Sequence, residues 1–181
     1  MDSLEIDRNL IISLNKGDLK AFDKIVVFYQ KIIYNHLYRF INNADDAADL
    51  TQETFIKVYK NKDKIDLNKN FKSWLYMIAT NTAYDWLKKK KRQPNFEELD
   101  EVVEFETNSP QSSYYNIEQL KIMDLENALK AIKPNAENIL RLYYEQGFTY
   151  QEIAEILNIP INTVKTNLSR AKKELLKKFE S

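Results

Sequence analysis

The sequence has no cysteine, two glycines, four prolines and one histidine among 181 residues. Without cysteine the chain can form neither disulfides nor thiolate metal sites, which suits a reducing compartment. With so little glycine and proline to build tight turns, helices are favoured over a sheet. The sequence also lacks a signal segment and any apolar run of roughly 18 residues. We therefore expect a soluble protein of the cytoplasm.

The same scarcities argue against an enzyme. The single histidine, His36, lies at helical spacing in IIYNHLYRF, where a core or surface position is the better interpretation. The sequence shows no glycine-rich phosphate loop and no cluster of metal ligands. The carboxylates of DDAADLTQE fall on successive faces of one helix and lack a second set of ligands. We expect no catalytic residue, no metal and no cofactor.

Charge is balanced in total but uneven along the chain. The sequence has 27 Lys and Arg against 27 Asp and Glu, so the formal net charge is zero. Basic residues gather in LKKKKR (87–92) and in VKTNLSRAKKELLKK (164–178), whereas residues 93–119 contain seven acids and no Lys or Arg. Two basic blocks around an acidic segment suggest two sites for a polyanion. Ordinary solvated helix faces are the alternative.

Apolar residues spaced three and four apart predict a first helical domain over residues 1–92. Residues 7–41 fit two helices joined near Gly17, and residues 71–92 fit one longer helix. Between them lies a further helix, 43–61, whose N-cap is expected to be Asn43, Asp45 or Asp46.

A linker and a second domain follow. Residues 93–118 lack periodicity and contain Pro, Ser, Asn and acids, which predicts a flexible acidic linker. Helical spacing returns over 119–181, with Pro134 suited to a first helical turn and Gly147 to a helix end. The expected fold is all-α, with two small helical domains joined by this linker.

The segment TYQEIAEILNIPINTVKTNLSRAKKEL, residues 149–175, has the spacing of a helix-turn-helix. Thr149 and Glu152 fit a capping box, and Asn158 tolerates the left-handed conformation that a sharp turn needs. In the second helix, one face is apolar and the other carries small polar and basic side chains. The second helix of this motif lies in the major groove of DNA. A plain helical hairpin with a solvated face is the alternative.

The segment FKSWLYMIATNTAYDWLKKKKR, residues 71–92, interleaves aromatic and basic residues. This mixture suits single-stranded nucleic acid, because bases stack on aromatic rings while cations hold phosphates. The alternative is that the aromatic residues fill the core, and we expect Trp74 to do so.

Three motifs together resemble the extracytoplasmic-function (ECF) sigma factors of bacterial RNA polymerase. They are DDAADLTQETFIKVY, the 71–92 segment, and LRLYYEQGFTYQEIAEILNIPINTVKTNLSRAKKEL, in this order over nearly the whole chain. The resemblance implies a protein that binds core polymerase, recognises the −35 and −10 promoter elements and helps to melt DNA. It also implies an anti-sigma factor as a partner, no insertion into a membrane, and phosphoryl chemistry left to the polymerase.

The resemblance also assigns residues to three surfaces. For polymerase binding it implies Asp46, Asp49, Gln52, Glu53 and Phe55. The alternative role for these residues is helix capping and solvation of a helix face. For the −10 element, including a flipped base, it implies Asn70, Phe71, Asn81, Tyr84, Lys88, Lys89, Lys90, Lys91 and Arg92. For the −35 element it implies Asn162, Thr163, Lys165, Thr166, Asn167, Ser169, Arg170 and Lys173.

Two positions depart from the family pattern. Members often have Gly before TVK and Arg after TVKS, where this chain has Asn162 and Asn167. Asn162 is compatible with a turn or a first helical turn. Asn167 bears on specificity, because Arg pairs with the acceptors of guanine whereas Asn pairs with adenine. We expect a −35 element with fewer guanines than is common in the family.

Two other protein classes compete with a sigma factor. A stand-alone regulator would bind DNA as a dimer through the helix-turn-helix, but it would need neither DLTQETF nor the aromatic and basic helix. A pure interaction protein would occupy polymerase or an anti-sigma factor without starting transcription. The intact basic and aromatic residues argue against the second class.

Overall fold

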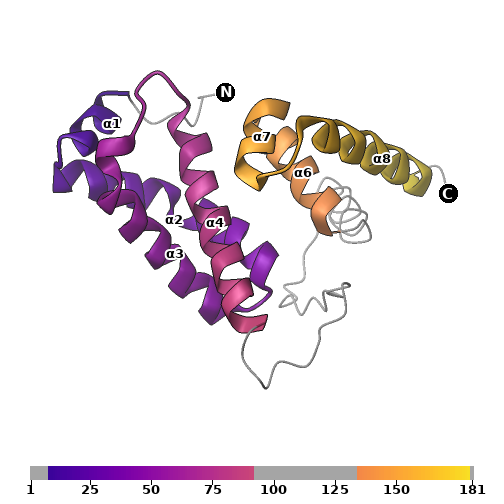
Figure 1. The fold of residues 1–181 in the computed structure, drawn as a ribbon, viewed down its shortest axis with the longest axis horizontal. Coiled ribbons are helices and arrows are strands. Elements are labelled where there is room, and N and C mark those ends of the chain that lie inside the picture. Colours follow the sequence, from indigo (N-terminus) through magenta and orange to yellow (C-terminus); the bar gives the residue numbers. More distant parts are fainter. Residues whose placement is uncertain (1–7, 92–133, 180–181) are drawn as a thin grey trace, which may run out of the picture. The chain divides into compact units, whose positions relative to one another are not determined.

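The computed structural model describes residues 8–91 and 134–179, with side chains described over 8–91 and 136–173. The chain divides into two compact units, residues 1–96 and 97–181. Both are helical, and neither described range contains a strand (Figure 1). The all-α prediction is confirmed. The predicted linker at 93–118 and the helical pattern that begins at 119 lie outside the described residues.

Three long helices form the body of the first unit, and they pack against one another (Figure 1). A shorter N-terminal helix packs on the first of them, and a single 3-10 turn follows the second. The elements are α1 (Arg8–Asn15), α2 (Leu19–Ile41), α3 (Ala44–Lys60), η1 (Lys62–Lys64) and α4 (Phe71–Lys91).

Short polar residues set the helix boundaries of this unit. Gly17 has φ 89°, so the predicted joint between α1 and α2 falls on a residue suited to that conformation. The side chain of Asp18 caps α2 by accepting from the Lys20 amide at 2.8 Å. Of the three caps considered for the next helix, Asn43 is the one used, accepting from the Asp46 amide at 3.0 Å.

The core of the first unit is built from one apolar face of each long helix. It includes Ile25, Ile33 and Leu37 of α2, Ala47, Leu50 and Val58 of α3, and Leu75, Ala79 and Ala83 of α4. Trp74 is half-buried and lies 5.8 Å from Phe71, ring centre to ring centre, so its predicted core position is confirmed only in part.

The second unit contains α6 (Pro134–Tyr144), α7 (Tyr150–Leu157) and α8 (Ile161–Phe179). Pro134 is the first residue of α6, as predicted. Gly147 follows the end of α6 with φ 73°, and the next amide, of Phe148, donates to the Leu142 carbonyl at 3.1 Å. None of the helices in the two described ranges is long and apolar enough to span a bilayer.

His36 is buried at the centre of the first unit. Its Nε2 lies 2.9 Å from the Thr80 hydroxyl, and its ring packs between Phe40 and Tyr76 at 5.1 and 4.7 Å. Burial, together with the positive charge of Arg39, lowers the pKa of His36 to about 3. The imidazole is therefore neutral in the folded protein, as a core residue.

The His36 environment predicts a pH dependence of stability. Below pH 6.5 the unfolded chain takes up a proton that the folded protein, with a pKa of about 3, refuses. The free energy of unfolding should therefore fall as pH falls below 6.5, with this residue contributing up to about 1.4 kcal/mol per pH unit. Both tryptophans lie in the first unit, so urea unfolding followed by tryptophan fluorescence reports on it.

His36→Gln is the matched variant, because an amide can either donate to or accept from the Thr80 hydroxyl but does not titrate in this range. The variant should show a shallower loss of stability between pH 6.5 and 4.5. Equal pH slopes in the two proteins would contradict this account of His36.

Candidate functional site

One side of α3 presents polar side chains to solvent. Asp49, Gln52 and Glu53 are exposed, and Ile56 follows at the same helical spacing with 53% of its surface exposed. We call these four residues the α3 outer face. Asp46, one turn earlier, is half-buried. A single exposed apolar side chain is normal on a protein surface, so this face is defined mainly by its polar residues.

Phe55 lies on the other side of α3, in the core, with 5% of its surface exposed. It is therefore not available for direct contact with a partner, unlike the other four residues assigned with it. Thr51 and Thr54 are buried beside it, and their hydroxyls donate to the carbonyls of Ala47 and Leu50 at 2.7 Å. Ile56 was missed in the sequence, although an apolar residue out of phase with the buried positions could have revealed it.

Two residues assigned to the −10 element lie at the start of α4, where Asn70 is exposed and Phe71 is buried. The Asn70 side chain accepts from the Ser73 amide at 3.3 Å and so caps the helix. Phe71 is buried, with 6% exposed, and its ring lies 6.1 Å from Tyr29 and 5.8 Å from Trp74. Phe71 therefore presents no free ring face to a base in this structure.

The rest of the −10 set lies along the outer side of α4. Asn81, Lys88, Lys89 and Lys91 are exposed, whereas Lys90 is half-buried. Tyr84 is also half-buried, with its ring at 90° to that of Phe40, and burial raises the pKa of its hydroxyl. Arg92 lies outside the described residues.

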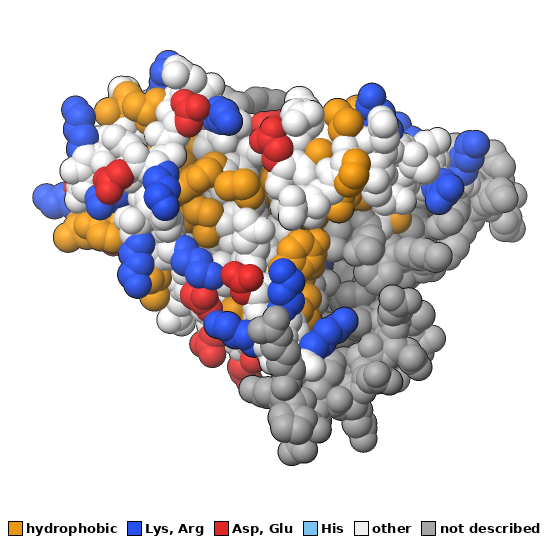
Figure 2. All heavy atoms as spheres, in the orientation of Figure 1, with side chains coloured by type: hydrophobic (Ala, Val, Ile, Leu, Met, Phe, Trp, Pro, Cys, Tyr) orange, Lys and Arg blue, Asp and Glu red, His pale blue; other side chains and the backbone are white. Residues whose placement is uncertain are grey.

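Ion pairs connect the acids of α3 with nearby lysines. The Lys90 ammonium lies 3.7 Å from an Asp46 carboxylate oxygen and 4.3 Å above the centre of the Trp86 ring. Lys57 binds Glu53 at 2.8 Å and donates to the Thr82 hydroxyl at 3.1 Å. Figure 2 accordingly shows acidic and basic side chains intermixed on the visible face of this unit. The surface offers paired charges and no broad patch of one sign there.

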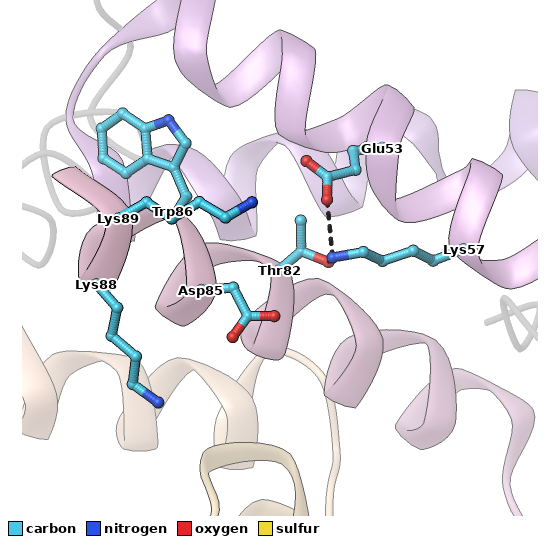
Figure 3. A pocket seen from close by; sticks show the side chains of 7 residues that line it. All are labelled: Glu53, Lys57, Thr82, Asp85, Trp86, Lys88 and Lys89. Atoms are coloured by element: carbon cyan, nitrogen blue, oxygen red, sulfur yellow. Dashed lines mark hydrogen bonds and ion pairs between the residues drawn. The ribbon is translucent and has the colours of Figure 1, made fainter.

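A pocket of about 230 Å³ opens between α3 and α4. In Figure 3 the Glu53–Lys57 ion pair and Thr82 form one end of it, Trp86 and Lys88 form the other, and Asp85 lies between. Lys89 completes the lining. Its size is below the roughly 300 Å³ at which sites for small-molecule ligands begin. It has room for one side chain or one base.

In the second unit the capping box is present. The Thr149 hydroxyl accepts from the Glu152 amide at 3.2 Å, and the Glu152 carboxylate accepts from the Thr149 amide at 2.8 Å. Asn158 has φ 52°, the left-handed conformation expected at the turn. Ile153, Ala154, Ile156 and Leu157 are buried.

The outer face of α8 carries the residues assigned to the −35 element. Asn167 is half-buried, and the remaining seven are exposed: Asn162, Thr163, Lys165, Thr166, Ser169, Arg170 and Lys173. On the opposite face Val164, Leu168 and Ala171 are buried. Short polar and basic groups on one exposed helix face can reach base edges and phosphates.

Lys172 belongs to a different surface. Its ammonium lies 5.3 and 5.8 Å from the ring centres of Tyr144 and Tyr143 of α6, and a hydrogen bond with Tyr144 raises its pKa. Arg141 of α6 is 6% exposed and binds Glu137 at 2.8 Å and also Glu145. The Lys172 contacts join α8 to α6, whereas the Arg141 ion pairs connect successive turns along α6.

Comparison with protein families gives two matches. Residues 25–93 match Sigma-70 region 2, and residues 122–175 match Sigma-70, region 4. The first match includes the α3 outer face and α4, and the second includes the helix-turn-helix.

Curated relatives match over almost the full chain. The ECF RNA polymerase sigma factor SigW of Bacillus subtilis is 35% identical over 93% of this chain and 94% of its own length. The ECF RNA polymerase sigma-E factor of Escherichia coli K12 is 30% identical over 96% of this chain and 94% of its own.

Solved structures show the same fold. The sigma factor RpoE of Bartonella quintana, in complex with the anti-sigma factor NepR, has a TM-score of 0.68 at 24% identity, with 89% of this chain and 98% of that chain covered. CnrH in complex with the cytosolic domain of CnrY has a TM-score of 0.63 at 18% identity, with 96% and 97% covered.

The burial difference on α3 predicts that two substitutions differ in the size of their effect on stability. Phe55→Ala should lower the free energy of unfolding of the first unit by about 3 kcal/mol or more, because it empties a core position. Gln52→Ala should change it by less than about 0.5 kcal/mol, because the side chain is exposed. Urea unfolding followed by tryptophan fluorescence checks both values. Equal losses would show that the two residues share one environment.

Proposed function

This chain belongs to the ECF sigma factors of the sigma-70 family. We propose that separate exposed faces bind core polymerase, the −10 element and the −35 element during transcription initiation. It is an RNA polymerase sigma factor and not an enzyme. Residues 1–92 are the domain for polymerase binding and the −10 element, residues 93–118 the acidic linker, and residues 119–181 the −35 domain. The match of region 2 to residues 25–93 and of region 4 to residues 122–175 supports this division.

The α3 outer face is the proposed surface for core polymerase. It combines two acids, an amide and one exposed apolar side chain on a rigid helix, within the part that matches Sigma-70 region 2. Asp46 extends this surface, whereas Phe55 supports it from the core. This arrangement is the observation that carries the proposal, because a DNA-binding regulator that acts alone has no use for it.

The outer side of α4 is the proposed surface for the −10 element. Asn81 and the exposed lysines can hold phosphates and base edges, and Tyr84 provides a partly exposed ring. Lys90 is the exception, because in the free chain it forms an ion pair with Asp46 and a cation–π contact with Trp86. Asn70 and Phe71 act by fixing the start of α4.

The outer face of α8 is the proposed reader of the −35 element. Lys165, Arg170 and Lys173 are placed to bind phosphates, and Asn167 to pair with a base edge. Thr166 donates its hydroxyl proton to the Asn162 carbonyl at 2.8 Å, so it can offer DNA only an acceptor. The α6 helix, the first described helix of this unit, is the proposed contact for the polymerase flap.

An anti-sigma factor completes the proposed partners. The relationship to RpoE, whose structure contains the anti-sigma factor NepR, supports this partner class. We place the protein in the cytoplasm, where polymerase and promoter DNA are found.

Gln52→Ala should weaken the complex with core polymerase about five-fold or more, because it removes a central side chain of the α3 outer face without disturbing the core. Gln30→Ala is the matched control, since Gln30 is an exposed residue of α2 away from that face. Titration of labelled core polymerase by fluorescence anisotropy measures both. Equal affinities of the two variants would argue against this docking face.

Two substitutions on α8 separate phosphate contacts from base recognition. Lys165→Ala should weaken promoter binding for all sequences and reduce the salt slope by about one. Asn167→Ala should instead relax the preference for adenine at one −35 position, with an effect of about 1–3 kcal/mol. Selection of −35 sequences by the polymerase complex measures both effects. G-rich selected sites that Asn167→Ala leaves unchanged would refute the assignment of Asn167.

A further inference from the structure

Three tyrosines and one lysine meet where the helices of the second unit pack together (Figure 1). Tyr143 and Tyr144 end α6, Tyr150 begins α7, and Lys172 lies on α8. The Tyr143 ring lies 4.9 Å from that of Tyr144 and 5.1 Å from that of Tyr150, centre to centre. We call these four residues the tyrosine–lysine cluster. None of them belongs to the residue sets assigned above to the polymerase, the −10 element or the −35 element.

We propose that Lys172 is a positioning residue for recognition of the −35 element, because its contacts with α6 hold α8 at the rotation about its own axis that presents Asn167 to a base edge. The proposal rests on the sigma-factor function given above and adds to it a residue that touches no DNA. Ser169 and Lys165, three and seven residues earlier, lie on the same side of α8 as Lys172. A rotation at Lys172 is therefore passed directly to residues of the −35 set.

The surroundings of Lys172 distinguish it from the lysines assigned to phosphates. Lys165 and Lys173 are exposed, whereas Lys172 is half-buried. Its ammonium lies over the rings of Tyr144 and Tyr143, whose negative faces attract a cation. A hydrogen bond with Tyr144 holds the same group and raises the pKa of Lys172. Because binding a phosphate would break these contacts, Lys172 is better suited to holding α8 than to holding DNA.

The buried face of α8 constrains rotation less than these contacts do. Val164, Leu168 and Ala171 are buried, and apolar burial has no preferred direction. The hydrogen bond and the cation–π contacts of Lys172 depend on direction as well as distance. Since hydrogen bonds to base edges weaken beyond about 3.2 Å, a small rotation of α8 is enough to change base preference.

The rings that Lys172 contacts are themselves held by α7. A hydrogen bond with Tyr150 joins the two helices and raises the pKa of Tyr143. The capping box of Thr149 fixes the start of α7, one residue before Tyr150. The orientation of α8 therefore depends on both other helices of the unit, and loss of Lys172 should free α8 at one edge without opening the core.

The test uses the complex of the full chain with core polymerase and a pool of promoter duplexes whose −35 element is randomised. Sequencing of the bound duplexes measures the enrichment of each base. Anisotropy titrations of one labelled promoter at several salt concentrations measure the salt slope. The wild-type chain should enrich its preferred base about five-fold or more where α8 reads the DNA, the smaller end of discrimination by one base contact.

Lys172→Met should reduce this enrichment to less than about two-fold and leave the salt slope unchanged, because it removes a charge but no phosphate contact. Lys172→Arg should restore most of the enrichment, since a guanidinium also binds aromatic faces. Lys173→Met is the matched control, because it removes the neighbouring exposed lysine of the −35 set. It should reduce the salt slope by about one and keep the enrichment.

Tyr144→Ala tests the cluster from α6 without changing any charge. Tyr144 is 58% exposed, so its removal should leave the core intact. The variant should lower the −35 enrichment as Lys172→Met does. Tyr38→Ala, which removes a tyrosine of α2 that is 40% exposed, should leave the enrichment unchanged.

A salt slope lower by about one in Lys172→Met, with base enrichment unchanged, would make Lys172 a phosphate contact and overturn the proposal. Wild-type enrichment in both Lys172→Met and Tyr144→Ala would also overturn it and leave the sigma-factor function intact. Weaker binding of core polymerase by Tyr144→Ala, with unchanged enrichment, would make the tyrosines a polymerase contact instead. Failure of the wild-type chain to join core polymerase would overturn both proposals.

Discussion

The burial of apolar residues between α2, α3 and α4 determines which side chains of the first unit reach its surface. With Leu50 and Val58 in the core, the helical period leaves the α3 outer face exposed. Each fully buried side chain of this kind contributes about 1.5–3 kcal/mol, whereas the half-buried ion pair between Asp46 and Lys90, still in contact with solvent, contributes about 1 kcal/mol or less. Packing therefore fixes the positions of the charged groups, which remain able to exchange partners.

The second unit depends more on local hydrogen bonding at its turns. The Thr149 capping box starts α7, and the left-handed Asn158 ends it, with the Ile159 amide donating to the Ala154 carbonyl at 3.1 Å. These contacts determine the angle at which α8 leaves the turn. Since α8 buries Val164 and Leu168, its polar face is held outward without any contribution from DNA.

Sequence periodicity predicted the helices, the capping box and the polar face of α8, because each depends on residues close together in the chain. The family resemblance assigned Phe55 and Phe71 to binding surfaces, but both are buried. A match to a motif identifies the position of a residue and not its exposure. Ile56 was missed although its position out of phase with the buried residues could be read from the sequence, whereas the pocket could not be predicted. Asp85 and Trp86 acquire their setting from Glu53 and Lys57 of another helix, a long-range contact that the sequence pattern does not encode.

The central claim is that this chain is a sigma factor with a docking face for polymerase on α3. The most direct measurement is co-elution of the purified chain with core RNA polymerase on a sizing column in the absence of DNA. The account predicts a stable complex of the two. Separate elution, together with binding of DNA by a dimer of the chain alone, would contradict it and indicate a stand-alone regulator.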